Sequence, residues 1–438
     1  MQVAVEKNLF ASRMSHLGSE NAFKIGPYIR EVEARGERVI KCNIGEPDFP
    51  LPKHIAEAVK QAIDDDQTHY VDPQGIEPLR RAVAKQISDT RGIAVTPDRV
   101  VVFPGAKPPI GFAQHAYCDP FDEVVYPSPG FPIYESFTRY VGAVPLALHL
   151  REENGFACGG DELAPLLSNR TKLVYLNFPS NPTGGVASAA QLADLARVLR
   201  DRLPEGARVY SDEVYEAILF DGEQHRSIAS FPGMAERTII VSGVSKTYSW
   251  TGGRLGWAVF PTVEEAQTFK NLNINYYSCV PGYNQLGAKV AIESPESPRE
   301  IARMVAAFQQ RRDVIVRALN EIDGITCTTP KGAFYLFPNI SGVVRSVGAL
   351  EAHAALPPST RVRTTPATLF QLFLLFRYGV ATLDRKSFGV IGSEGKHYLR
   401  MSIATSLDEL EQAVVRIAAA ASDRAGFGRF VDEGEHLT

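Results

Sequence analysis

Short apolar runs that alternate with helical patterns constrain the fold of this chain more than any other feature. Six runs in its middle are rich in β-branched and aromatic residues and are predicted to be strands: residues 100–103, 123–126, 172–176, 208–211, 238–241 and 255–260. Several are apolar on both faces, which is typical of strands covered by helices on both sides. Helical patterns lie before and between them, at residues 53–65 and 190–199. The alternation predicts an α/β domain of three layers.

The pattern changes from about residue 298. A long helical pattern at 299–322 leads to a predicted strand at 325–328, and the alternation at 398–403 predicts a half-buried strand. Residues 357–360 and 364–366 are interpreted as loops because they are rich in proline, serine and threonine.

A chain of 438 residues exceeds the usual single domain, so two domains are expected. We predict a large domain at 46–298 and a smaller α+β domain at 299–438, which residues 1–45 join as an N-terminal arm.

Composition excludes several classes of partner. The net charge is −4, from 46 basic and 50 acidic residues, which is too mild to indicate a nucleic acid or an anionic membrane. The five cysteines are scattered and odd in number, so they are interpreted as reduced thiols of a cytoplasmic protein and not as metal ligands. No signal peptide is visible, and the most apolar run, residues 370–376, is too short to span a bilayer.

Polar and glycine residues follow the predicted strands where a ligand of such a fold would bind. Gly105, Asn181, Asp212 and Ser245 all come after strand ends, and ligands of open α/β sheets bind outside the carboxyl ends of the strands. The run Gly105-Ala106-Lys107 precedes a presumed helix, so its backbone N–H groups can approach a phosphate at a helix N-terminus.

A lysine and an arginine separated by a short loop indicate the ligand. The amine of Lys246 can form a Schiff base with an aldehyde, and the guanidinium of Arg254 can hold a phosphate. Upstream, Asp212 can pair with a ring nitrogen, while Tyr215 and Asn181 can hydrogen-bond a ring hydroxyl. These groups together predict a site for pyridoxal 5'-phosphate (PLP) and no metal.

The order of the motifs supports a family resemblance. The chain resembles the class I/II PLP-dependent aminotransferases of the type I PLP fold, close to the bacterial aspartate aminotransferase-like group, from about residue 12 to 405. The resemblance rests on Gly45-Glu46-Pro47-Asp48-Phe49, Tyr70, Gly105-Ala106-Lys107, Asn181-Pro182-Thr183-Gly184, Asp212-Glu213-Val214-Tyr215, Ser245-Lys246, Arg254-Leu255-Gly256, Gly332-Ala333-Phe334-Tyr335 and Leu399-Arg400.

The resemblance implies a fold and an activity. The fold would be a large, mostly parallel sheet domain with a smaller α+β domain. The enzyme would move an amino group from an L-amino acid to a 2-oxo acid by a ping-pong aldimine/ketimine mechanism, and it would act as a homodimer with shared active sites.

The resemblance also implies roles for single residues. Lys246 would form the Schiff base and shuttle the proton, and Asp212 and Tyr215 would serve the cofactor ring. Phe131, or as second choice Tyr134, would stack on that ring. Tyr70 would reach the neighbouring subunit's phosphate. Residues expected at the substrate are Gly45, Asn181, Phe334 and Arg400, the last as clamp of the α-carboxylate.

Three segments depart from the family pattern. Gly243 stands where a serine is common, so Ser242 or Ser245 is expected to bind the phosphate instead. Residues 345–371 resemble an insertion. The loop at 383–389 lacks the usual Pro-Gly, and Arg385 in it is a candidate reader of a distal substrate carboxylate. These departures keep open an alternative on the same fold, namely a PLP-dependent lyase, decarboxylase or cyclase of specialised metabolism. A PLP-binding regulator is disfavoured because the catalytic set is complete.

Overall fold

The computed structural model describes residues 9–18, 24–389, 395–434 and 436. A seven-stranded sheet forms the centre of the large domain, in the order β2-β8-β7-β6-β5-β3-β4. Only β8 runs antiparallel to its neighbours. The strands are β2 (Val100–Phe103), β3 (Glu123–Ser128), β4 (Val144–His149), β5 (Thr171–Asn177), β6 (Arg208–Asp212), β7 (Thr238–Gly243) and β8 (Gly256–Val259). The mostly parallel sheet of the expected α/β fold is therefore present.

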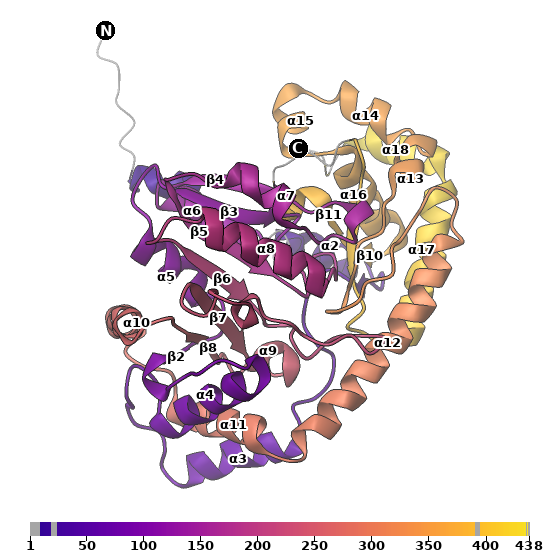
Figure 1. Ribbon diagram of the computed structural model, residues 1–438. Coiled ribbons are helices and arrows are strands. Elements are labelled where there is room, and N and C mark those ends of the chain that lie inside the picture. The colour runs from indigo at the N-terminus through magenta and orange to yellow at the C-terminus, as the bar shows by residue number, and fades with distance from the viewer. Residues whose placement is uncertain (1–8, 19–23, 390–394, 435, 437–438) are drawn as a thin grey trace.

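Helices cover both faces of this sheet (Figure 1). On β2, Val101 and Phe103 pack into one buried cluster, whereas Val100 and Val102 pack into another. The first cluster includes residues of α5 (Pro108–Tyr117), α6 (Ile133–Tyr140) and α10 (Val263–Tyr277), and the second those of α3 (Lys53–Asp64), α4 (Glu77–Arg91) and α11 (Gly282–Glu293). Helix α8 (Ala189–Arg202) packs near β5 and β6, completing the three layers.

The smaller domain is joined to the sheet domain by a long helix, α12 (Ser297–Asn320), which runs along one edge of the molecule in Figure 1. It contains two small sheets. In one, β1 (Ile40–Lys41) pairs with β10 (Val380–Ala381), and in the other, β12 (Leu399–Ser402) lies between β11 (Leu383–Asp384) and β9 (Tyr335–Leu336). The helices are α2 (Gly26–Ala34), α13 (Ser341–Ser346), α14 (Ala349–Ala355), α15 (Pro358–Arg363), α16 (Pro366–Tyr378), α17 (Leu407–Ser422) and α18 (Arg424–Glu433).

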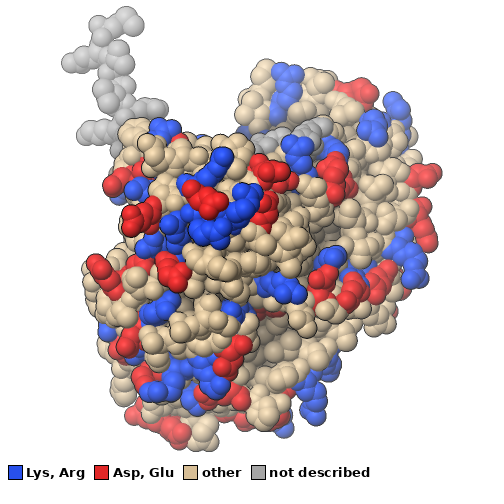
Figure 2. Space-filling view, in the orientation of Figure 1, with Lys and Arg blue, Asp and Glu red and all other residues tan. Residues whose placement is uncertain are grey.

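The apolar run 370–376 is the buried centre of α16 and packs inside the smaller domain. Among the described residues, no helix is long and apolar enough to cross a membrane. Basic and acidic side chains are interspersed over the face seen in Figure 2.

Two predictions of secondary structure were wrong, and one strand was missed. The predicted strand 325–328 forms only one bridge, Thr326 to Asn339, because the Asn320 side chain takes the backbone groups of Cys327 that a ladder would use. Residues 357–360 were interpreted as a loop, but residues 358–360 begin α15, which Pro358 can open because a helix needs no N–H donor there. Strand β4 was missed, since it is a half-exposed edge strand with a proline.

The predicted insertion, residues 345–371, is largely helical. It contains the end of α13, all of α14 and α15, and the start of α16. Of the predicted loop 364–366, residues 364 and 365 are not helical and Pro366 begins α16. The side chain of Thr365 accepts a hydrogen bond from the Thr368 amide and thereby caps this helix.

Candidate active site

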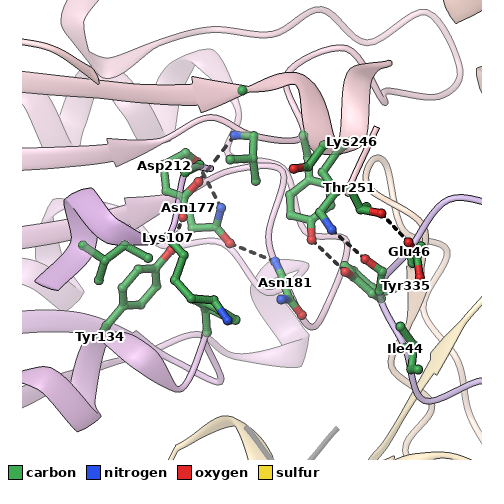
Figure 3. A pocket seen from close by; sticks show the side chains of 18 of the residues that line it. Ile44, Glu46, Lys107, Tyr134, Asn177, Asn181, Asp212, Lys246, Thr251 and Tyr335 are labelled. Atoms are coloured by element: carbon green, nitrogen blue, oxygen red, sulfur yellow. Dashed lines mark hydrogen bonds between the residues drawn. The ribbon is translucent and has the colours of Figure 1, made fainter. Parts of the chain in front are cut away.

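Neighbouring strands end at one level and bring the predicted residues together. Asn177 at the end of β5 pairs with Asp212 at the end of β6, which pairs with Val241 of β7. Strand β7 then leads into α9 (Val244–Thr247), which carries Lys246. These strand ends border a cavity of about 520 Å³ (Figure 3). Its lining includes Gly45, Ala106, Lys107, Phe131, Tyr134, Asn181, Asp212, Tyr215, Ser245, Lys246, Arg254, Tyr335 and Arg400.

Lys246 reaches across this cavity to the segment that enters from the N-terminal side. Its Nζ donates a hydrogen bond to the backbone oxygen of Gly45 at 2.6 Å. Gly45 cannot carry a side chain, because a Cβ there would lie 2.0 Å from the hydroxyl of Tyr335. The glycine thus lets the backbone approach the lysine closely, and the amine is held at the cavity wall.

Asp212 is a buried carboxyl group on the opposite side of the cavity (Figure 3). Burial raises the pKa of Asp212 to about 6, while a hydrogen bond from the Tyr134 hydroxyl favours the charged form. That bond joins Tyr134 Oη to Asp212 Oδ2 at 2.6 Å. The Asn177 amide donates to the backbone oxygen of Asp212 at 3.0 Å and fixes the strand end. A cationic ring nitrogen beside this carboxylate would offset the cost of its burial.

A second cluster of polar side chains consists of Tyr215, Tyr335 and Arg400. The hydroxyls of Tyr215 and Tyr335 are 2.7 Å apart, and the guanidinium of Arg400 lies 4.7 Å from the ring centroid of Tyr335. Arg400 donates to the side-chain oxygen of Asn181 at 3.2 Å and to the backbone oxygen of Asn43. The arginine is thereby aimed from β12 toward the residues of the large domain, at the boundary between the two domains.

The end of the cavity near Gly105 and Arg254 has features of a phosphate-binding site. Gly105 has a φ of +92°, and a Cβ on it would lie 2.4 Å from Arg254 Nη2. Helix α5 begins three residues later; Ala106, Lys107 and Ile110 line the cavity, but Pro108 and Pro109 at the helix start have no N–H to donate. Gly243, which departs from the family pattern, lies against Gly256, since a Cβ on it would come 2.9 Å from the Gly256 Cα. A serine would not fit there without a shift, and Ser245 lines the cavity instead.

Two predicted substrate residues do not line the cavity, although Lys246 Nζ lies 5.9 Å from the ring centroid of one of them, Phe334. Phe334 is fully buried and stacks on Phe308 at 5.2 Å between ring centroids, while its neighbour Tyr335 lines the cavity. Arg385 is buried behind the 128–131 segment and donates to Ser128 Oγ at 3.1 Å and to the Gly389 oxygen at 3.3 Å. The side chain of residue 385 therefore turns into the protein and not into the cavity.

Phe131 and Tyr70, two aromatic residues predicted to contact the cofactor, have different surroundings. Phe131 lines the cavity, and Lys107 Nζ lies 5.5 Å from its ring centroid. Tyr70 is 89% exposed in the single chain and does not line the cavity.

Sequence reasoning missed Tyr335 and the bond between Tyr134 and Asp212. Tyr335 is adjacent to a predicted residue, and the alternation of a two-residue strand gives too little signal to choose its inward side chain. Tyr134 lies far from Asp212 in sequence, and only tertiary packing joins them.

One group of described side chains has the composition of a metal site. Glu213, Glu216 and His225 offer ligand atoms within 4.8 Å of one another. The guanidinium of Arg91 already pairs with both glutamates, at 2.8 Å from Glu213 and closer to Glu216, and Arg91 holds the pKa of Glu213 far below its usual range despite burial. This group is therefore a buried ion-pair network behind the strand ends.

Comparison with known proteins settles the family. The profile of the family "Aminotransferase class I and II" matches residues 37–417. The chain belongs to this family. It is 34% identical to an aspartate aminotransferase of Rhizobium meliloti over 94% of this chain and 95% of the relative. It is 33% identical to a probable aspartate/prephenate aminotransferase of Aquifex aeolicus over 94% of this chain and 98% of the relative.

A crystal structure of the Rhizobium meliloti aspartate aminotransferase is similar over 94% of this chain and 98% of that chain, with a TM-score of 0.84 and 33% identity. This class I/II aminotransferase is thus a PLP-dependent enzyme that transfers amino groups. The alternative of a lyase, decarboxylase or cyclase is not favoured, since the similar proteins are named as aminotransferases.

Proposed function

We propose that the cavity holds pyridoxal phosphate and that the predicted residues bind it and the substrate. One observation carries this proposal: the amine of Lys246, the buried carboxylate of Asp212 and two guanidinium groups line a single cavity of about 520 Å³. The donor set fits the cofactor, because Arg254 and the site near Gly105 suit its phosphate and Lys246 its aldehyde.

When bound, pyridoxal phosphate supplies an aldehyde that condenses with amines and a ring that takes up electrons from the substrate Cα. Lys246 would hold the aldehyde through its amine and, once an incoming amine has released it, would move a proton at Cα. Asp212 would keep the ring nitrogen protonated, while Tyr215 and Asn181 would hydrogen-bond the ring hydroxyl. Arg400 would bind the α-carboxylate with its planar pair of donors.

We propose L-aspartate as an amino donor. Two of the similar proteins are named for aspartate, and an acidic donor requires a cation beyond the one that binds its α-carboxylate. The cationic side chains that line the cavity are Lys107, Lys246, Arg254 and Arg400. The last three have roles in the proposed chemistry, so Lys107, whose Nζ lies near Phe131, is the best candidate to bind the distal carboxylate.

The test is a panel of amino donors with 2-oxoglutarate as acceptor. We expect transfer from aspartate, and we expect Lys107→Ala to lower kcat/KM for aspartate by about 10- to 150-fold, the effect of one charge-assisted hydrogen bond. Alanine as amino donor serves as the control, because it has no distal carboxylate, and its kcat/KM should change little in Lys107→Ala. Equal losses for aspartate and alanine would assign Lys107 to the cofactor and not to the donor, and absence of aspartate transfer by the wild type would refute the proposed donor.

We further propose a cytoplasmic homodimer with shared sites. Tyr70 is exposed although the family resemblance gives it a role, and the segment near the N-terminus exposes Leu9 and Phe10 by 86% and 67%, apolar surface that a second copy would cover. Mixing Tyr70→Phe with Lys246→Ala subunits tests this. The hybrid dimer contains one site with neither defect, so mixing should restore activity. Activity that stays at the sum of the two variants would contradict shared sites.

A further inference from the structure

The hydroxyl group of Tyr134 has a contact that the proposed chemistry does not yet use. Tyr134 is the second residue of α6 and is fully buried. Its Oη donates to Asp212 Oδ2 at 2.6 Å, whereas the other carboxylate oxygen, Oδ1, lies 3.4 Å from the Val214 amide. The short bond makes Tyr134 the closest hydrogen-bond donor of this carboxylate in the described part of the chain, and it lies at the cavity (Figure 3).

The position of this hydroxyl is fixed by the surrounding side chains. The ring of Tyr134 stacks on Tyr175, with 4.7 Å between centroids and 22° between planes. The Gln114 amide donates to the backbone oxygen of Tyr134 and to the Tyr175 hydroxyl, both at 3.0 Å. Tyr175 in turn donates to the Ile110 oxygen at 2.9 Å. Tyr175 thus covers one face of the Tyr134 ring, while Phe131, which also lines the cavity, stays the first candidate to stack on the cofactor.

The proton of this hydrogen bond stays on the tyrosine. Burial and the neighbouring Asp212 raise the pKa of Tyr134 well above its usual value, so the phenol is a permanent donor. Burial also raises the pKa of Asp212, and the bond from Tyr134 acts against that shift by favouring the carboxylate. Of the charged groups near Asp212, Glu213 disfavours the carboxylate and Lys246 favours it.

We propose that Tyr134 is a positioning residue that keeps the ring nitrogen of the bound cofactor protonated by holding Asp212 in its ionised form. This inference rests on the proposed cofactor site. One proton is shared between the ring nitrogen and the Asp212 carboxylate. A donor on Oδ2 stabilises the negative oxygen, so the proton stays on nitrogen. Without that donor the proton moves to Asp212, and both groups become neutral.

The test uses the cofactor-loaded protein with ¹⁵N at the pyridine nitrogen. Nitrogen NMR reports whether this atom is protonated, independently of turnover. In Tyr134→Phe, we expect the ratio of protonated to neutral nitrogen to fall by about tenfold or more, which corresponds to one pKa unit.

Tyr210→Phe is the matched control. Its ring is buried in the same cluster, 4.8 Å from that of Tyr175, but among the described residues its hydroxyl has no hydrogen-bond partner. This variant should keep the wild-type nitrogen signal. An unchanged signal in folded, loaded Tyr134→Phe, or an equal change in Tyr210→Phe, would overturn the proposal.

A second measurement uses the cofactor-free protein and adds a substitution that disturbs the packing less than Tyr134→Phe. In the cofactor-free protein, ¹³C-labelled aspartate reports the titration of Asp212, assigned by its loss in Asp212→Asn. Tyr134→Phe should raise the pKa of Asp212 by about one unit or more. A 3-fluorotyrosine at position 134 keeps the shape and donates more strongly, so it should lower this pKa. No shift with fluorotyrosine would refute the role of Tyr134 even if Tyr134→Phe failed to fold, and neither result depends on which amino donor the enzyme accepts.

Discussion

The two sides of the active site are built differently. The side that would bind the cofactor consists of strand ends, where Asn177 and Asp212 lie in register and β7 leads directly to Lys246. The side that would bind the substrate is assembled from loops and from the other domain, with Gly45 from the N-terminal segment and Arg400 from β12. The contrast shows that the position of a residue at a strand end can be predicted from the sequence. The position of a residue that domain packing brings to the cavity can be predicted only in part.

The cofactor side should respond most strongly to change. Replacing Lys246 by alanine removes both the covalent anchor and the proton carrier, so turnover should fall by about 10⁴-fold or more. Borohydride reduction of the wild type followed by peptide mass mapping should place the pyridoxyl group on Lys246. A label on another lysine would break the assignment of the strand-end side.

Asp212→Asn should have the next largest effect. An amide cannot hold the ring nitrogen in its cationic form, and the loss of such a preorganised charge costs about 10²- to 10³-fold in kcat. The cofactor should stay bound, because Lys246 and Arg254 are untouched, and its absorbance after gel filtration checks this. Near-normal turnover would mean that the carboxylate does not serve the ring.

The sequence-based predictions also differ between the cofactor side and the substrate side of the site. The strands on which Asp212 and Lys246 depend were predicted because apolar runs define them locally. Tyr335 and Phe334 could not be told apart, since the choice of which side chain faces the cavity depends on a two-residue strand, β9, pairing with β12. Arg385 was placed at the substrate by its loop, yet Asp384 caps the short helix that follows and the arginine is drawn inward to Ser128.

The buried carboxylate of Asp212 should also destabilise the cofactor-free protein at neutral pH. Its pKa is raised by burial to about 6 in the folded state, against a model-peptide value of about 3.9. The folded state therefore holds more protons than the unfolded state between these values, and stability falls as pH rises through this window. Asp212→Asn should be more stable than wild type by about 2–3 kcal/mol above pH 7 and equally stable below pH 4.

Urea unfolding of the two cofactor-free proteins at several pH values measures this difference. Cofactor loading should reverse its sign, because the wild-type carboxylate then has a cationic partner. A constant difference at all pH values would show that the stability change comes from packing and not from ionisation.

The smallest effect on selectivity is expected on the substrate side, at Arg385. Burial lowers the pKa of this arginine to about 10, and its donors bind Ser128 and Gly389. Arg385→Ala would leave the buried Ser128 hydroxyl and the partly buried Gly389 oxygen without this donor, at a cost of about 1–3 kcal/mol in unfolding free energy. Because the side chain does not line the cavity, the ratio of kcat/KM for aspartate to that for alanine should stay within about twofold, whereas Lys107→Ala should change it by tenfold or more. Measuring this ratio in both variants shows which side chain binds the distal carboxylate of the substrate. A larger change in Arg385→Ala than in Lys107→Ala would mean that Arg385 binds it.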